Sequence, residues 1–305
     1  MKILISGASG LIGAALKESL VREGHEAWAL TRRKTGEGKR EIAWDPRAGI
    51  EGDHSLEGFG AVIHLAGAAI GTRWTPARKA EIRDSRVKGT RLLSETLAVL
   101  HGKPEVLLCA SAIGFYGNRG GEEVDESAAP GTGYLPEVCQ EWEAATEPAR
   151  TAGIRVVNLR TGIVLTPRGG ALAQMLFPFK LGLGGPTGPG GQWMSWISLA
   201  DEVAAIRHAL WDKKVSGPLN LTAPHPVTNR EFARALGKVL RRPSFLPLPA
   251  FAVKLLFGEM GQNLLLDGQK VLPRKLQATG YRFSHPDLES ALRFELSKPD
   301  GKGAP

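Results

Sequence analysis

Short apolar runs and longer helical repeats alternate along the first half of the chain. Between the runs, apolar residues recur at helical spacing, as at Ile12, Leu16 and Leu20, and this period predicts amphipathic helices. Strands that alternate with long helices predict a parallel sheet with right-handed crossovers, covered on both faces. In such a sheet, ligands bind at the carboxyl ends of the strands. The predicted strands cover residues 2–6, 25–31, 61–65, 106–110 and 155–159.

The pattern changes after about residue 165. A glycine- and proline-rich stretch at 182–191 is expected to form a mobile loop near the ligand site. A strand-like segment at 219–221 follows, and then a helix that begins at Thr228 or Asn229. A last helix begins near Pro286. The chain is therefore predicted to be an α/β protein: a Rossmann-type, doubly wound parallel sheet with a smaller C-terminal α/β lobe.

Length and composition fit this picture. A chain of 305 residues can bury one full α/β core and a smaller second lobe. Its 42% hydrophobic and 23% charged residues are typical of ordinary soluble globular proteins, which argues against disorder. The longest apolar stretch, 245–253, is well short of the roughly 20 residues that span a bilayer. We expect no membrane partner.

Two features of the chain bear on its compartment. The N-terminal apolar run is short and ends in glycine, so it predicts a first strand and not a signal peptide. Cys109 and Cys139 form no disulfide framework and no metal-ligand pattern, which favours a reducing compartment and no metal site. The expected location is the cytoplasm.

The formal net charge is +8, from 39 basic and 31 acidic residues. Such a balance can indicate nucleic acid, anionic ligands or solubility alone. The basic residues are spread along the chain, and no aromatic-interleaved or zinc-finger pattern accompanies them. We therefore expect no nucleic-acid partner. Binding through net charge alone would weaken steeply with salt.

A glycine-rich turn follows the first predicted strand and opens the first predicted helix. Gly7 would permit the tight turn, Gly10 would let the backbone approach a pyrophosphate, and Gly13 would let helix and sheet pack closely. The helix that starts at Leu11 and Ile12 would supply amide donors and the positive end of its dipole. This context predicts a dinucleotide site. The alternative is that the glycines only build a turn.

The end of the second strand bears on which dinucleotide is bound. An NAD site normally has an acidic residue there for the ribose hydroxyls, but this chain has Thr31, Arg32 and Arg33. Guanidinium groups hold a 2′-phosphate, whereas a carboxylate repels it. The pattern favours NADP(H), with a solvated basic turn as the alternative.

Eight segments, in their order along the chain, resemble those of extended short-chain dehydrogenases/reductases. They resemble most closely the sugar-nucleotide-epimerase-like group called epimerase family proteins. Members of that group carry a small C-terminal domain of their own, which residues 243–292 match. The resemblance covers nearly the whole chain. The segments that carry it are the turn at 7–13, 64–67, 85–90, 111–117, 137–143, 159–165, 196–198 and 220–224.

The resemblance implies cofactor contacts at matching positions. Backbone groups at the strand ends would line the crevice, and Arg86 would offer a cation to phosphates. For Glu81 and Arg86, an exposed pair on a charged helix is the alternative. The implied contacts are Thr31, Arg32, Leu65, Ala66, Glu81, Arg86 and Val164.

The catalytic residues of the wider superfamily match only in part. A typical member uses a serine, a tyrosine and a lysine four residues later, and the lysine lowers the tyrosine pKa. Ser111 and Tyr134 fit the first two positions, but Val138 stands in place of the lysine. Proton transfer near neutral pH would then be slower unless Arg86 or Arg160 supplies the positive charge.

Other candidate groups are weaker. Tyr116 follows the strand that carries Ser111 and is a second candidate for catalysis, with a half-buried structural aromatic as the alternative. Cys139 is expected to be a packing residue because nothing beside it would stabilise a thiolate. His64 is expected to contact backbone near the cofactor and is not expected to act as a base.

Two functions remain open at this point. The first is an NADP(H)-dependent oxidoreductase or epimerase-like enzyme that moves hydride to or from a small, sugar-like or other, substrate. The second is a non-catalytic NADP(H)-binding regulatory or scaffold protein, which the missing lysine favours. We expect a monomer or homodimer. The expected domains are the NADP-binding domain at 1–165, with elements continuing to about 240, a substrate-facing lobe at 166–297, and a tail at 298–305.

Overall fold

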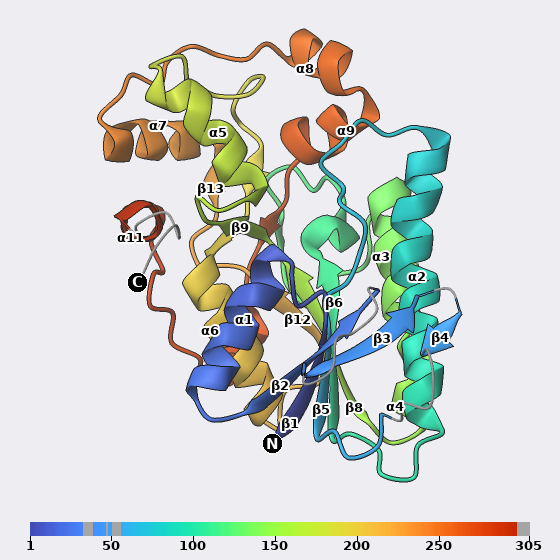
Figure 1. The fold of residues 1–305 in the computed structure, drawn as a ribbon. Coiled ribbons are helices and arrows are strands. Elements are labelled where there is room, and N and C mark those ends of the chain that lie inside the picture. Colours follow the sequence, from blue (N-terminus) through green and yellow to red (C-terminus); the bar gives the residue numbers. More distant parts are fainter. Residues whose placement is uncertain (33–38, 47, 51–55, 298–305) are drawn as a thin grey trace.

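A single twisted sheet forms the centre of the molecule (Figure 1). The computed structural model describes residues 1–32, 39–46, 48–50 and 56–297. The strand order is β12-β8-β6-β5-β1-β2-β3-β4. Seven of these strands run parallel, and β4 pairs antiparallel with β3. Their bounds are β1 Lys2–Ser6, β2 Glu26–Thr31, β3 Glu41–Asp45, β4 Gly49–Ile50, β5 Ala61–His64, β6 Val106–Ala112, β8 Arg155–Thr161 and β12 Gly217–Leu221.

Helices cover both faces of the sheet, as predicted for a doubly wound fold. Ile3 and Ile5 of β1 pack with Leu16 on one face, whereas Leu4 packs with Leu93 on the other. Alternate residues of one strand are thus buried in different cores. The helices on the first face are α1 Leu11–Arg22 and α6 Leu199–Trp211, and those on the second are α2 Pro76–Ala98, α3 Tyr134–Ala144 and α4 Glu147–Thr151.

All five predicted strands form, with small differences at their ends. β6 and β8 each extend two residues beyond the prediction, because polar residues such as Ser111 and Arg160 continue the ladder where the apolar run stops. The pair β3 and β4 was not predicted. It is short and lies at the edge of the sheet, so its apolar signal is weak. The last helix begins at Leu288, two residues after Pro286, where it was expected to start.

The remaining elements gather mainly above the carboxyl ends of the strands, and we call the part formed by α5, α7, α8, α9 and η2 the upper lobe (Figure 1). The buried side chains Leu172, Phe232 and Leu236 belong to its core, against α11. Bounds in the upper lobe are α5 Gly170–Lys180, α7 Asn229–Leu240, α8 Ala250–Phe257, α9 Glu259–Gly261 and η2 Gln262–Leu266. The other elements are η1 Ile113–Tyr116, β7 Glu123–Val124, β9 Ile163–Leu165, β10 Trp193–Met194, β11 Trp196–Ser198, β13 Val227–Thr228, β14 Lys270–Val271, α10 Arg274–Ala278 and α11 Leu288–Ser297.

Local sequence signals explain how the upper lobe is built. Thr228 caps α7, and Glu231 bonds back to the Thr228 backbone in a capping box. The glycine-rich stretch at 182–191 is tied to the rest of the lobe, since Gly188 N donates to Leu248 O at 2.8 Å. The predicted domain boundaries stay predictions, and the predicted tail at 298–305 lies outside the described residues. No helix among the described residues is long and apolar enough to cross a membrane.

Candidate functional site

The turn between β1 and α1 contains the three glycines of the predicted motif. Gly7 has a φ of 70°, in the left-handed region that favours glycine. A Cβ on Gly13 would lie 2.2 Å from Gly7 O, so any side chain there would force the backbone apart. The first turn of α1 has neither an acidic residue nor a side-chain cap at Gly10. This cradle of backbone amides at a helix N-terminus fits a phosphate-bearing dinucleotide.

The carboxyl end of β5 closes one side of this turn. A Cβ on Gly7 would lie 2.9 Å from the Leu65 carbonyl, and Ala66 N donates to Ser6 Oγ at 3.3 Å. The Ser6 hydroxyl also lies 2.6 Å from His64 Nδ1. Burial lowers the pKa of His64 to about 4, so this ring is neutral. His64 therefore bonds a side-chain hydroxyl, and its expected contact with backbone stays a prediction. Leu65 and Ala66 lie beside the glycine turn.

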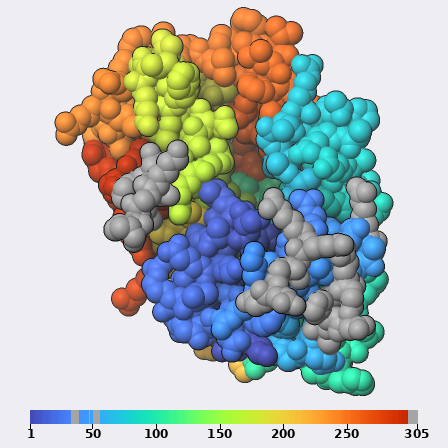
Figure 2. All heavy atoms as spheres, viewed as in Figure 1, coloured from blue at the N-terminus to red at the C-terminus, as the bar shows by residue number. Residues whose placement is uncertain are grey.

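Leu11 and Val164, two predicted cofactor contacts from distant parts of the chain, both lie close to Gly170. A Cβ on Gly170 would lie 3.8 Å from both Leu11 Cδ2 and Val164 O. Ile12 is partly buried and packs on the core beneath. The start of α1 and the end of β9 are thus neighbours. A space-filling view shows a hollow between α5 (yellow-green) and α2 (cyan), above the sheet (Figure 2).

The basic end of β2 is only partly described. Thr31 is the last residue of the strand, and Arg32 follows it with an exposed side chain. Arg33 lies outside the described residues. The contacts of Thr31 and Arg32 with an adenosine phosphate therefore stay predictions.

Glu81 and Arg86 lie on α2 but have different surroundings. Glu81 pairs with Arg78 at 2.6 Å and its side chain is half exposed. Arg86 donates to the Ala68 and Ile82 carbonyls at 3.0 and 3.1 Å, and its guanidinium lies over the Trp142 ring. An exposed Glu81–Arg86 pair is therefore not what the structure shows. Their roles as cofactor contacts stay predictions.

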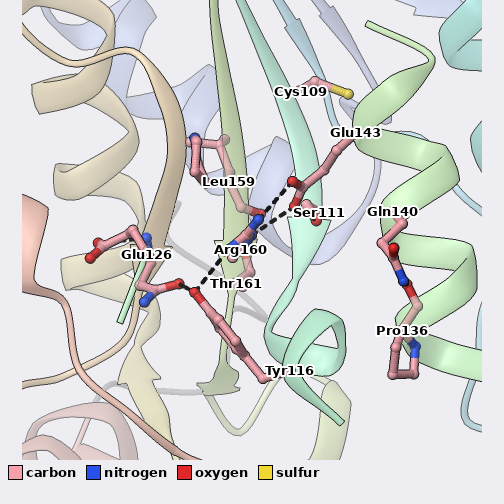
Figure 3. A network of polar contacts seen from close by, with 12 residues as sticks. Cys109, Ser111, Tyr116, Glu126, Pro136, Gln140, Glu143, Leu159, Arg160 and Thr161 are labelled. Atoms are coloured by element: carbon pink, nitrogen blue, oxygen red, sulfur yellow. Dashed lines mark hydrogen bonds and ion pairs between the residues drawn. The ribbon is translucent and has the colours of Figure 1, made fainter. Parts of the chain in front are cut away.

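Ser111 belongs to a network of buried polar side chains (Figure 3). Its hydroxyl donates to Glu143 Oε1 at 2.7 Å. Arg160 holds the same carboxylate with two bonds, Nε to Oε1 at 2.8 Å and Nη2 to Oε2 at 2.9 Å. The Ser111 proton is thus directed at Glu143, which leaves the lone pairs of Oγ as the part that can receive a bond.

Tyr116 completes the far end of this network. Its hydroxyl donates to Asn220 Oδ1 at 2.7 Å and accepts from Arg160 Nη1 at 3.0 Å. The side chain is fully buried, and burial raises its pKa to about 12. A catalytic role for Tyr116 stays a prediction, and this geometry argues against it.

Tyr134 lies apart from the network, at the first residue of α3. Its hydroxyl donates to Lys79 O at 2.7 Å, and the Lys79 ammonium lies 4.4 Å from the ring centroid. Burial raises the Tyr134 pKa, while the positive charge of Arg86 acts in the opposite direction. Val138, one turn later, is buried. Within the described residues, no hydrogen bond joins Tyr134 to Ser111.

The two cysteines are inert packing residues. Burial raises the pKa of both the Cys109 and the Cys139 thiols to about 12, so neither forms a thiolate near neutral pH. A separate cavity of about 410 Å³ lies between α1 and α6, with Ser19, Arg168 and Arg207 in its lining. None of the predicted site residues lines it.

The sequence did not predict the contacts of three residues that organise the site. Glu143, Arg160 and Asn220 each stand in a segment that carries the family resemblance, and that was the available signal. Arg160 was considered only as a possible cation for Tyr134, whereas it bonds Glu143 and Tyr116. Spacing alone cannot show that these residues meet, because they come from α3, β8 and β12.

Comparison with known proteins decides the family. Residues 3–221 match the model of the NAD dependent epimerase/dehydratase family. The chain belongs to this family. Residues 248–295 match a second model, described as a domain of unknown function (DUF1731). The two matches, in this order, confirm the resemblance to epimerase family proteins with a small C-terminal domain of their own.

Family relatives are similar along their whole length. Epimerase family protein Mb2239 of Mycobacterium bovis is 43% identical over 298 residues, which cover 97% of this chain and 98% of that protein. Human epimerase family protein SDR39U1 is 38% identical over 299 residues, which cover 96% and 99%. The family likeness therefore includes both the sheet and the upper lobe.

Solved structures confirm the predicted Rossmann-type fold. A crystal structure of human SDR39U1 (isoform 2) with NADPH has a TM-score of 0.90 at 35% identity, covering 98% of this chain and 100% of that chain. UDP-glucose 4-epimerase of Thermus thermophilus, solved with NAD, has a TM-score of 0.74 at 21% identity, covering 97% and 98%, which shows a shared fold alone. A family described as NAD dependent agrees with the predicted nicotinamide cofactor.

Proposed function

We propose that the protein binds NADP(H) and transfers hydride between nicotinamide and a carbonyl or carbinol carbon of a small substrate, as an oxidoreductase or epimerase-like enzyme. The observation that carries the proposal is the cradle at Gly7 and Gly13. There, other backbone atoms lie so close that a side chain would not fit. Arg32 at the end of β2 favours NADP(H) over NAD(H). The NADPH in the crystal structure of human SDR39U1 supports the same choice.

The residues of this chain supply binding, orientation and the proton. A bound nicotinamide supplies or accepts the hydride. Ser111, whose own proton is held by Glu143, accepts a bond from a substrate hydroxyl or a carboxamide at the end of β6. Tyr134 is the group that exchanges a proton with the substrate oxygen, after its hydroxyl turns from the Lys79 carbonyl. Arg86, whose positive charge opposes the rise of the Tyr134 pKa that burial causes, supplies the positive charge that the missing lysine would give.

The cofactor part is tested by titration with NADPH and NADH, followed by nicotinamide fluorescence. The wild type should prefer NADPH, and Arg32→Ala should lose that preference by roughly tenfold or more. Arg40→Ala, which removes an exposed arginine just before β3, serves as the charge control and should change little. Failure of the wild type to bind either dinucleotide would remove the basis of the proposal.

The chemical part is tested by carbonyl-dependent oxidation of deuterated NADPH across a panel of small carbonyl compounds. Tyr134→Phe should slow turnover roughly 100-fold or more while leaving NADPH affinity unchanged. Equal turnover in Tyr134→Phe would show that another group moves the proton. The panel includes nucleotide sugars because sugar-like substrates remain within the proposed class.

A second candidate function rests on Val138 and the engaged hydroxyls. Because Ser111 and Tyr134 already donate to Glu143 and to the Lys79 carbonyl, the chain could bind NADP(H) without turning it over, as a regulatory or scaffold protein. Tight NADPH binding without deuteride transfer to any compound would favour this function.

We propose the cytoplasm as the compartment, because both cysteines are buried and unpaired. We also propose that the protein is a monomer or homodimer.

A further inference from the structure

Exposed apolar side chains of the protein gather on the upper lobe. Fourteen large apolar side chains are exposed in the described part of the chain, and nine of them lie on two segments of this lobe. The first segment is the end of α5 with the turn after it, and the second runs from residue 245 through α8. We call these nine residues the apolar cap: Phe177, Leu181, Leu183, Phe245, Leu246, Leu248, Phe251, Leu255 and Leu256.

The two segments of the apolar cap are joined into one surface. Leu246 N donates to Gly184 O at 3.2 Å, and Leu248 N donates to Pro186 O at 2.9 Å. Arg242 Nε donates to Lys180 O at 3.0 Å. In the space-filling view, α5 (yellow-green) and α8 (orange) lie together at the top of the molecule (Figure 2). Exposed apolar side chains gathered on two adjoining segments in this way are typical of an interaction site.

The outer face of α8 is apolar where a surface helix is normally polar. Phe251 and Leu255 stand one turn apart and are 74% and 73% exposed, whereas Val253 points inward and is fully buried. The exposed Lys254 is the only charged residue of the helix. This arrangement suits a helix that lies flat in an apolar–polar boundary.

The charges around the apolar cap are mainly positive. Residues 231–259 contain five basic residues and two acidic ones, and Lys180 is the only charged residue between 169 and 200. Of the two acidic residues, Glu231 caps α7 and Glu259 pairs with Lys79. A second copy docked on this face about a twofold axis would bring like charges together. An anionic lipid surface is instead complementary, since lysine and arginine near such a surface each add attraction.

We propose that the apolar cap is the site at which the protein docks on an anionic membrane surface. Phe251 and Leu255 enter the boundary between headgroups and acyl chains, and Lys180 and Lys254 contact anionic headgroups. The contact is peripheral and departs from the expectation of no membrane partner. It does not depend on the proposed reaction, because none of these residues belongs to the candidate site.

The experiment is flotation of the full-length protein with lipid vesicles. One set is phosphatidylcholine alone, and in the other roughly a third of the lipid is phosphatidylglycerol. The wild type should float with the anionic vesicles only. Phe251→Ser with Leu255→Ser should lower the partition coefficient roughly tenfold or more. Lys180→Glu with Lys254→Glu should lower the partition coefficient by a similar factor. Added salt should reduce the difference between this variant and the wild type.

The matched control is Val21→Ser with Val99→Ser, which removes two exposed apolar side chains elsewhere on the surface and should leave flotation unchanged. Thermal unfolding and NADPH titration check that each variant is folded. The proposal is overturned if the wild type does not float, or if Phe251→Ser with Leu255→Ser floats equally well. A dimer seen by sedimentation and abolished by that pair, without vesicle binding, would overturn it in favour of a second copy on the apolar cap.

Discussion

The glycine turn after β1 and the network around Ser111 lie at the same edge of the sheet but are built in opposite ways. The turn comes from residues 7–13 alone and leaves backbone groups open to a ligand. The network joins side chains from β6, α3, β8 and β12, and those side chains are bonded to one another. In the proposed function, cofactor binding thus rests on local backbone shape, whereas Ser111, which fits the serine position of the superfamily, is part of a buried polar network.

The sharpest test of this contrast is Glu143→Ala. The variant leaves the Arg160 guanidinium buried without its carboxylate, so the free energy of unfolding should fall by about 3–5 kcal/mol. Glu141→Ala, on the same helix, removes an exposed partner of Arg83 and should cost about 0–1 kcal/mol. Chemical denaturation measures both. Equal losses in the two variants would mean that the network does not hold the core together.

A smaller effect is expected from Gly13→Ala in the turn. The new Cβ would meet Gly7 O, and such overpacking costs about 1–3 kcal/mol of unfolding free energy. The NADPH dissociation constant should rise at the same time, because the cradle itself is displaced. Gly191→Ala, with open space around it, is the control for both measurements. Weakened stability with unchanged NADPH affinity would separate the turn from the cofactor site.

The smallest effect is the change in unfolding free energy over one pH unit that a buried carboxyl group beside β8 is expected to cause. Glu202 accepts a bond from Thr161 and is fully buried, and burial raises its pKa from 4.5 to about 8. The folded state therefore keeps a proton that the unfolded state loses. Its contribution is complete below pH 4.5 and is lost as pH rises through about 8. In this window the unfolding free energy should fall by up to about 1.4 kcal/mol per pH unit.

Glu202→Gln should remove this slope, and denaturation at several pH values measures the difference from the wild type. His64 acts in the opposite sense, since its depressed pKa makes stability decrease as pH falls from 6.5 towards about 4. The comparison of variant with wild type cancels that contribution. An unchanged slope in Glu202→Gln would show that Glu202 is ionised in the folded protein.

The sequence by itself determined the features that depend on near neighbours along the chain. Apolar runs set the strands, helical spacing set α1, and the glycines at 7, 10 and 13 specified a turn that only small residues can form. The edge pair β3 and β4 was missed because a few residues at a sheet edge carry little periodicity.

Only the tertiary structure decided which side chains meet. Ser111, Glu143, Arg160 and Asn220 are far apart in sequence, and parallel strands with crossover helices bring them to one edge. The same packing turned the Tyr134 hydroxyl to the Lys79 carbonyl and left the apolar cap facing outward. Hydrogen-bond direction and burial depend on contacts across the whole fold, and residue spacing carries no record of them.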